Sequence, residues 1–190
     1  MAYILKNSSN YNQVGNLNNM DDTKDCYWTT KESWVEALSF VPKSIRLWLP
    51  FYGNGMAVEI VKSLGYEVVA SPSLERGGNF YEYSPDPDSY DLIMDNPPFS
   101  KKKELLTRLH TFNKPFILFY PLESITQIGV RKLAQDNEYA MLLPKKHFTF
   151  IKNDKIITMK NIVLYCFDDY KINNNWTKLG LPQINTLDYI

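Results

Sequence analysis

The sequence contains few residues of the kinds that metal sites and disulfide frameworks require. Its 190 residues include only two cysteines, Cys26 and Cys166, and two histidines, His110 and His147. Two cysteines so far apart in sequence indicate neither a disulfide framework nor a zinc site. We therefore predict a reduced, intracellular protein of the cytoplasm or nucleus, without a bound metal.

Long apolar runs and an excess of charge of one sign are also missing. No apolar run approaches the roughly 18 residues of a membrane-spanning helix, and the first residues lack the basic and then apolar order of a secretory signal. The formal net charge is zero, with 21 basic and 21 acidic residues. A nucleic-acid site would therefore have to come from local clustering of lysines, and we expect no membrane partner.

What the chain does contain is a globular composition, 44% hydrophobic and 14% aromatic, in segments that alternate between strand and helix patterns. The strand-like runs lie at residues 45–51, 66–70, 92–94, 115–120, 139–143 and 161–167. The helix-like runs lie at residues 30–41, 56–64, 101–112 and 125–137. Alternation of this kind predicts an α/β domain with a parallel sheet and right-handed crossovers. We assign residues 26–170 to that domain, residues 1–25 to a flexible arm and residues 171–190 to a tail.

The most distinctive segment is the turn Asn96-Pro97-Pro98-Phe99, which directly follows a short apolar run and Asp95. A double proline cannot continue a strand ladder, so the strand must end at Asn96. The prolines also hold two φ angles near −65° and thereby fix the directions of the Asn96 side chain, the Pro97 carbonyl and the Phe99 ring. The pattern indicates a preorganised turn at the carboxyl end of a strand.

Such a turn suits a planar amino group. The Asn96 side-chain oxygen and the Pro97 carbonyl could accept both hydrogens of a nucleobase amine while Phe99 stacks on the base. As that nitrogen attacks a methyl donor it becomes positive, so the two oxygens would bind the transition state better than the ground state. The alternative is a strand-ending turn with Phe99 packed into the core.

A second motif, Phe51-Tyr52-Gly53-Asn54-Gly55, stands between a predicted strand and the helix at 56–64. Its glycines permit positive φ angles and close approach of the backbone to a ligand. Strand, glycine turn and helix together form a typical cofactor cradle, although many strand-to-helix turns use a lone Gly-x-Gly.

With both motifs in place, the chain resembles the S-adenosylmethionine-dependent N6-adenine DNA methyltransferases. The resemblance covers roughly residues 28–169. It implies a Rossmann-like class I methyltransferase fold, with a seven-stranded, mostly parallel sheet and helices on both faces. It also implies that the glycine loop lies against S-adenosyl-L-methionine and that Asn96, Pro97, Pro98 and Phe99 are catalytic. Some RNA and protein-amide methyltransferases share such turns, so amine methylation is implied more firmly than DNA.

The resemblance also implies a set of cofactor-binding positions. They are Thr29, Thr30, Phe51, Tyr52, Gly53, Asn54, Gly55, Ser71, Asn79, Phe80 and Asn96. Thr29 and Thr30 can equally be the start of a plain amphipathic helix. The acids usual in the family are missing before the glycine loop, at Ser71 and at Asn79, and Glu75 is the only nearby substitute. This departure predicts weak cofactor binding, because serine replaces a charge-assisted contact to ribose poorly.

Two basic segments are candidates for nucleic-acid binding. Lys101, Lys102 and Lys103 begin a helix, where positive charge opposes the helix dipole. The second segment is Lys145-Lys146-His147-Phe148, whose mixture of basic and aromatic residues suits flipped bases. The alternatives are a solvated basic face for the first, and an edge strand with Phe148 directed inward for the second.

These motifs predict a methyltransferase acting on the N6 amine of adenine in DNA, with RNA or a protein amide as alternative substrates. The chain leaves no room for a separate target-recognition domain, so a partner protein could supply sequence specificity. A different class remains open, a catalytically silent binding or scaffold subunit, because several of the family's acids are missing.

Overall fold

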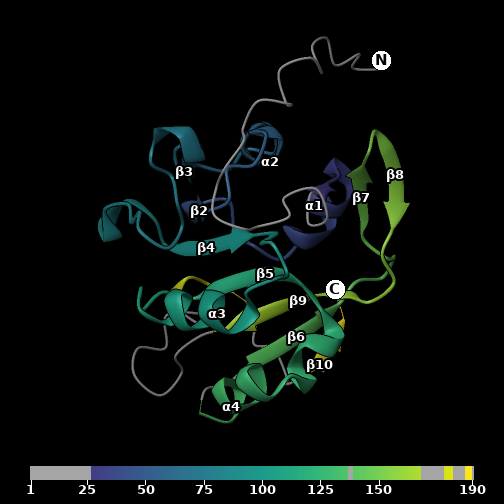
Figure 1. Cartoon of the computed structure of the whole chain (residues 1–190). Coiled ribbons are helices and arrows are strands. Elements are labelled where there is room, and N and C mark those ends of the chain that lie inside the picture. The colour runs from purple at the N-terminus through teal and green to yellow at the C-terminus, as the bar shows by residue number, and fades with distance from the viewer. Residues whose placement is uncertain (1–26, 137–138, 168–177, 182–186, 190) are drawn as a thin grey trace.

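The computed structural model describes residues 27–136, 139–167, 178–181 and 187–189. The six strand-like runs of the sequence and a short strand at residues 187–189 form a seven-stranded sheet (Figure 1). Its order is β10-β6-β9-β5-β4-β2-β3. The strands are Leu47–Leu49 (β2), Val68–Ala70 (β3), Leu92–Asp95 (β4), Phe116–Pro121 (β5), Tyr139–Leu143 (β6), Ile162–Phe167 (β9) and Leu187–Tyr189 (β10).

Strand directions in this sheet are mixed. β3, β2, β4 and β5 are parallel neighbours, and β10 is parallel to β6. β9 lies between β5 and β6 and is antiparallel to both. It pairs with β5 from Phe116↔Phe167 to Pro121↔Ile162. All six side chains of β9 are buried, as its wholly apolar sequence predicts for a central strand.

A second, antiparallel sheet has the order β1-β7-β8 and contains Trp28–Thr29 (β1), Thr149–Lys152 (β7) and Lys155–Thr158 (β8). Asn153 and Asp154 join the last two strands with φ angles of 50° and 58°, as a two-residue hairpin turn of type I′ requires. In Figure 1 this hairpin stands beside α1, at one end of the molecule.

The second sheet overturns the predicted fold class. A single seven-stranded, mostly parallel Rossmann-like sheet was the wrong expectation, because residues 149–158 pair with one another and with β1 instead of extending a parallel sheet. The chain is instead a mixed α/β structure with two sheets, one of them antiparallel.

Helices cover both faces of the larger sheet, and the sheet separates the core into two clusters. α1 (Lys31–Ala37) and α2 (Met56–Ser63) bury their apolar side chains with one cluster, and α3 (Lys102–His110) and α4 (Ile128–Asp136) contribute to the other. Successive side chains of a strand point to opposite faces. Leu92 and Met94 therefore pack with α1 and α2, whereas Ile93 packs with α3.

Short 3-10 turns connect these elements. They are Leu74–Arg76 (η2), Pro87–Ser89 (η3) and Leu122–Thr126 (η4). The first two lie between β3 and β4. No helix in the described part of the chain is long and apolar enough to cross a membrane.

The helix starts agree only partly with the sequence signals. Thr30 caps α1 as predicted, with Oγ1 accepting from Ser33 N at 3.4 Å, but the helix ends at Ala37. Lys101 occupies the N-cap position of α3, and no side-chain hydrogen bond caps that helix. The predicted arm at residues 1–25 lies outside the described residues. Within the predicted tail, the described residues include β10 and the buried Leu181.

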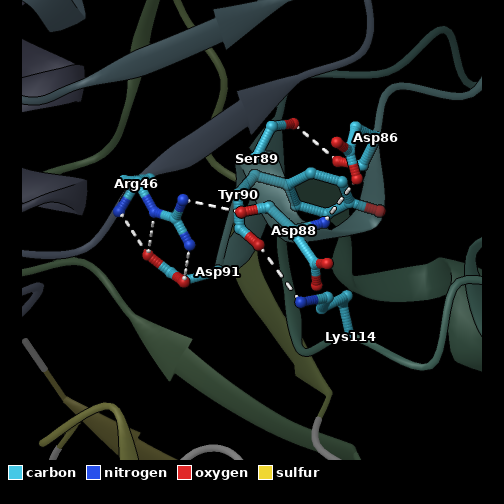
Figure 2. A network of polar contacts seen from close by, with 7 residues as sticks. All are labelled: Arg46, Asp86, Asp88, Ser89, Tyr90, Asp91 and Lys114. Atoms are coloured by element: carbon cyan, nitrogen blue, oxygen red, sulfur yellow. Dashed lines mark hydrogen bonds and ion pairs between the residues drawn. The ribbon is translucent and has the colours of Figure 1, made fainter.

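An ion pair joins the amino ends of β2 and β4 (Figure 2). The Arg46 guanidinium donates to both carboxylate oxygens of Asp91, at 3.0 and 2.7 Å, and Arg46 N donates to the same carboxylate at 2.9 Å. These hydrogen bonds lower the pKa of Asp91. Arg46 also donates to Asp88 O at 2.7 Å, and Lys114 donates to Tyr90 O at 3.2 Å. The network fixes the edge of the sheet opposite to the motif turns.

Candidate functional site

The two motif turns are neighbours at the carboxyl edge of the larger sheet. The glycine loop follows β2, the Asn96 turn follows β4, and these strands are adjacent and parallel. β3 lies on the other side of β2, so the strand order reverses between β2 and β4. Ligands of open α/β sheets bind outside the carboxyl ends of the strands at such a reversal. The predicted placement of both turns is confirmed.

Asp95 connects the two turns. Its carboxylate accepts from Phe51 N at 2.7 Å and from Asn96 N at 2.8 Å, and the residue is 2% exposed. Burial raises the pKa of Asp95 to about 7, and the two backbone hydrogen bonds oppose that rise. Sequence reasoning missed this residue, because the motifs give Asp95 no role of its own. The signal that could have found it was an acid at the end of an apolar run, immediately before the Asn96 turn.

The Asn96 side chain is held in one orientation. Its Nδ2 donates to Tyr27 O at 2.9 Å, and a carbonyl can only accept, so the amide oxygen must face the other way. Asn96 Oδ1 is buried and has no hydrogen-bond partner in the described part of the chain. A buried acceptor left unsatisfied costs about 1–3 kcal/mol. The turn therefore presents an oriented acceptor that a donor would satisfy.

The rest of the turn is partly covered. Pro97 is buried, and Pro98 and Phe99 are half-buried. The Phe99 ring meets Tyr120 edge to face, with centroids 6.1 Å apart, and packs against both halves of the core. Phe99 thus contacts the core, as one of the two alternatives from the sequence expects, and keeps part of its surface exposed.

Contacts within the chain leave no room for a side chain at either glycine of the glycine loop. Gly53 has φ 53°, and a Cβ there would lie 2.5 Å from a ring carbon of Trp28. Gly55 has φ 81°, and a Cβ there would lie 2.9 Å from the Tyr52 hydroxyl. Asn54 Oδ1 accepts from Met56 N at 3.0 Å at the start of α2. The close approach at Gly53 is therefore made by the Trp28 indole.

Thr29 and Thr30 are both buried but differ in their hydrogen bonds. Thr30 Oγ1 lies 2.7 Å from Thr149 Oγ1, and Ser33 Oγ accepts from Thr149 N at 2.8 Å. These hydrogen bonds join the start of α1 to β7. Thr29 Oγ1 has no partner in the described part of the chain. The hydroxyl of Thr29 is thus, like Asn96 Oδ1, one of six buried polar atoms without a partner in the described residues, and it lies two residues after the Tyr27 carbonyl that holds Asn96.

Three further predicted cofactor positions lie mainly inside the protein. Ser71 is 1% exposed and its hydroxyl accepts from Trp48 Nε1 at 3.0 Å. Asn79 Oδ1 accepts from Tyr81 N at 3.1 Å. Phe80 is buried and packs against the half-buried ring of Phe51, with centroids 4.8 Å apart. Of this region, only the exposed Glu75 on η2 keeps a carboxylate in solvent.

The predicted nucleic-acid residues fall into two groups that contact different elements. Lys101 Nζ lies 5.9 Å from the centre of the Tyr81 ring, and the aliphatic part of Lys103 packs beside Gly129 of α4. Lys146 N donates to Glu36 of α1 at 3.1 Å. Lys102 is half-buried, whereas Lys101, Lys103, Lys145, Lys146 and His147 are exposed.

Phe148 does not face solvent. It is 1% exposed, and its ring packs on Phe119 with centroids 4.9 Å apart. The inward alternative for Phe148 and Phe150 is the one that the structure supports, because both rings belong to the core. We correct the nucleic-acid set accordingly, since a buried ring cannot stack on a base.

In the residues that the structure describes, no group of three or more His, Cys, Asp or Glu side chains could hold a metal ion. Comparison with known proteins adds no family, since no family model matches the chain and no curated protein matches it either. The function has to be inferred from the chemistry of the site.

Proposed function

We propose that the chain is an amine methyltransferase that transfers a methyl group from S-adenosyl-L-methionine to the N6 amine of adenine in DNA. The observation that carries this proposal is the buried, unpartnered Asn96 Oδ1 at the carboxyl edge of the sheet. An incoming amine must displace the atoms that shield this oxygen, and it would then satisfy an acceptor that the folded chain leaves without a donor.

In this mechanism Asn96 Oδ1 and the Pro97 carbonyl accept the two amine hydrogens. The bond from Asn96 Nδ2 to Tyr27 O fixes the direction of the acceptor before substrate arrives. The exposed part of Phe99 contributes a stacking surface for the base, worth about 1–3 kcal/mol. Both oxygens interact more strongly as the attacking nitrogen becomes positive, so they favour the transition state over the ground state.

The donor set fits the cofactor in part. S-adenosyl-L-methionine supplies an electrophilic methyl group when bound. The unsatisfied Thr29 hydroxyl suits the charged methionine end, and the half-buried Phe51 ring suits an apolar part of the molecule. Glu75 is the carboxylate available to the ribose hydroxyls. One carboxylate in an exposed turn predicts weak binding by the isolated chain.

Four exposed lysines, two of which follow the carboxyl end of β6, support a nucleic-acid substrate. β6 runs in the same direction as β5, so Lys145 and Lys146 follow a strand that ends at the carboxyl edge. Lys155 of β8 and Lys160, two residues after the end of that strand, are also exposed. These four lysines form what we call the hairpin lysines. They supply local positive charge to a chain whose net charge is zero.

A second candidate, a catalytically silent binding or scaffold subunit, is favoured by one observation. Trp28 covers Gly53 and Trp48 engages Ser71, so two of the predicted cofactor contacts already have partners within the chain. Calorimetric titration with S-adenosyl-L-methionine, alone and with nucleic acid present, separates the candidates. Complete absence of binding in both conditions would leave the scaffold.

Substrate class is tested with isotopically labelled cofactor and three acceptors, namely duplex DNA, single-stranded RNA and a mixed protein extract. We expect label in adenine of the DNA. Label only in RNA or only in protein would keep the amine chemistry and overturn the choice of DNA.

A further inference from the structure

Asp95 bridges two loops at the point where their strands separate. The ladder between β2 and β4 ends at the pair Trp48↔Ile93, and β2 continues instead with β3 through Leu49↔Ala70. Beyond Ile93 one oxygen of the Asp95 carboxylate accepts from Phe51 N and so takes the place of a ladder bond, while the other oxygen accepts from the N–H of the next residue, Asn96. One side chain therefore sets the separation between the glycine loop and the Asn96 turn.

Holding two loops together with a buried carboxylate costs free energy, because the ionised form is removed from water. Asp95 is 2% exposed, and burial raises its pKa to about 7, so its ionised form is disfavoured. Only burial and the N–H groups of Phe51 and Asn96 shift that pKa, and no charged side chain of the described residues contributes. Arg46 and Asp91 already join the same two strands at their other ends with an ion pair. A buried acid without a cation therefore points to a role in the site.

We propose that Asp95 is a positioning residue, which holds the glycine loop and the Asn96 turn at the spacing that methyl transfer needs by accepting one backbone hydrogen bond from each. This inference rests on the proposed function. Asp95 does not touch the reacting atoms in this role. It acts through the backbone of Phe51 on the cofactor side and through that of Asn96 on the amine side. A misplacement of about 1 Å between reacting groups can cost about a hundredfold in rate.

The bridge itself can be tested without any activity. In the full-length chain labelled with ¹⁵N, the backbone amides of Phe51 and Asn96 should shift together with pH and share one midpoint. In Asp95→Asn neither amide should show that titration. Separate midpoints, or a shared midpoint that persists in the variant, would overturn the bridge.

Turnover then tests the positioning role, with duplex DNA and S-adenosyl-L-methionine at pH 8 and at pH 5.5. Asp95→Asn should lower kcat at least tenfold at pH 8 with little change in KM for DNA. The two proteins should converge at pH 5.5, because the wild-type carboxyl is then protonated. A role in stability alone would not produce this convergence. Asp95→Ser, which keeps one acceptor, serves if the asparagine variant does not fold.

The outcomes separate this inference from the proposed function. If Asp95→Asn keeps wild-type turnover at pH 8 while Asn96→Ala loses it, the positioning role is wrong and the proposed function stands. If the wild-type chain methylates no adenine substrate at all, the proposed function fails and the positioning role fails with it. The amide titration would still decide whether the bridge exists.

Discussion

The Trp28 indole lies over Gly53 so closely that no side chain fits between them. A Cβ on Gly53 would be 2.5 Å from one ring carbon and 3.3 Å from the next. The contact joins β1 of the small sheet to the loop after β2 of the large one. A glycine that the sequence associates with a cofactor is thus required by an aromatic ring of the same chain.

Gly53→Ala should consequently destabilise the chain by more than the cost of placing alanine at a positive φ angle, because the new Cβ also meets the Trp28 ring. Alanine at φ 53° costs about 1–2 kcal/mol, and overpacking adds about 1–3 kcal/mol. Gly65→Ala is the matched control, because Gly65 has φ 87° and a Cβ added there would meet no atom within 4 Å. Urea denaturation of both variants measures the difference. Equal losses of stability would show that the indole moves aside at no cost.

Asn96→Ala should reduce methyl transfer about a hundredfold or more, since one oriented acceptor of the transition state contributes about 2.7–4 kcal/mol. Stability should change little, because the removed amide leaves only the Tyr27 carbonyl without a donor. Asn161→Ala is the control. Asn161 is exposed and hydrogen-bonds Glu123 at the start of β9. If single-turnover assays give the Asn96 and Asn161 variants the same rate, Asn96 does not hold the amine in the transition state.

Thr29→Val and Thr30→Val should affect different properties of the protein. Valine has the shape of threonine without the hydroxyl, so at position 29 it removes a group with no internal partner and should leave stability unchanged or raised. If that hydroxyl binds the cofactor, affinity for S-adenosyl-L-methionine should fall about tenfold, equivalent to 1.4 kcal/mol. At position 30 valine removes the hydrogen bonds to Thr149 Oγ1 and from Ser33 N, and should lower the free energy of unfolding by about 1 kcal/mol or more. Calorimetry and thermal melting of both variants measure these effects. Unaltered cofactor affinity in Thr29→Val would exclude the Thr29 hydroxyl as a contact.

Binding to duplex DNA should weaken steeply with salt if the hairpin lysines contact phosphates. The log–log slope should approach about −0.9 per phosphate contacted, and alanine at all four positions should flatten it by up to about four such increments. Lys62→Ala is the control, since Lys62 is exposed in the last turn of α2, which leads away from the carboxyl edge. The same comparison with Lys101, Lys102 and Lys103 replaced shows whether that group contributes. An affinity indifferent to salt would favour a protein partner.

Asp95 should make the free energy of unfolding depend on pH in a defined window. Its folded pKa, raised by burial to about 7, lies above the unfolded value of about 3.9. The folded state therefore keeps a proton on Asp95 that the unfolded state loses, so the contribution of Asp95 to stability is largest below about pH 4 and falls as pH rises towards 7. Relative to Asp95→Asn, the wild-type chain should lose about 1.4 kcal/mol per pH unit in that window and nothing further above it. Parallel stability curves for the two proteins would mean that Asp95 is already ionised when folded.

Local patterns in the sequence predicted the parts of the fold that local forces determine. The double proline ends β4, the glycine turn separates β2 from α2, and Thr30 caps α1. The single-sheet prediction failed because the pairing of β1 with β7 has no local signature. β1 contains two residues, and its partner lies near the other end of the chain. The turn Asn153-Asp154 between two short β-branched runs was a local signal for the hairpin, which the predicted fold did not include.

The candidate site was predictable in its residue types and only partly in its contacts. The Asn96 turn could be recognised because proline chemistry is local. The direction of the Asn96 amide could not, since it depends on the carbonyl of Tyr27. The sequence also could not show which of the predicted ligand-contacting residues are buried. Ser71 and Phe148 have buried side chains with internal partners, whereas Glu75 is exposed.

The pairing of β1 with β7 also sets the order in which a newly made chain can complete this site. Asn96 emerges from a ribosome well before Phe150, the residue that pairs with Thr29. Until β7 has emerged, β1 has no ladder partner among the described elements, and the Tyr27 carbonyl has no strand to hold it against Asn96. The Asn96 turn thus leaves the ribosome with its prolines in place, but nothing yet fixes the orientation of the Asn96 side-chain amide. Completion of the site becomes a late event in biosynthesis, reached when the hairpin folds back onto the first part of the chain.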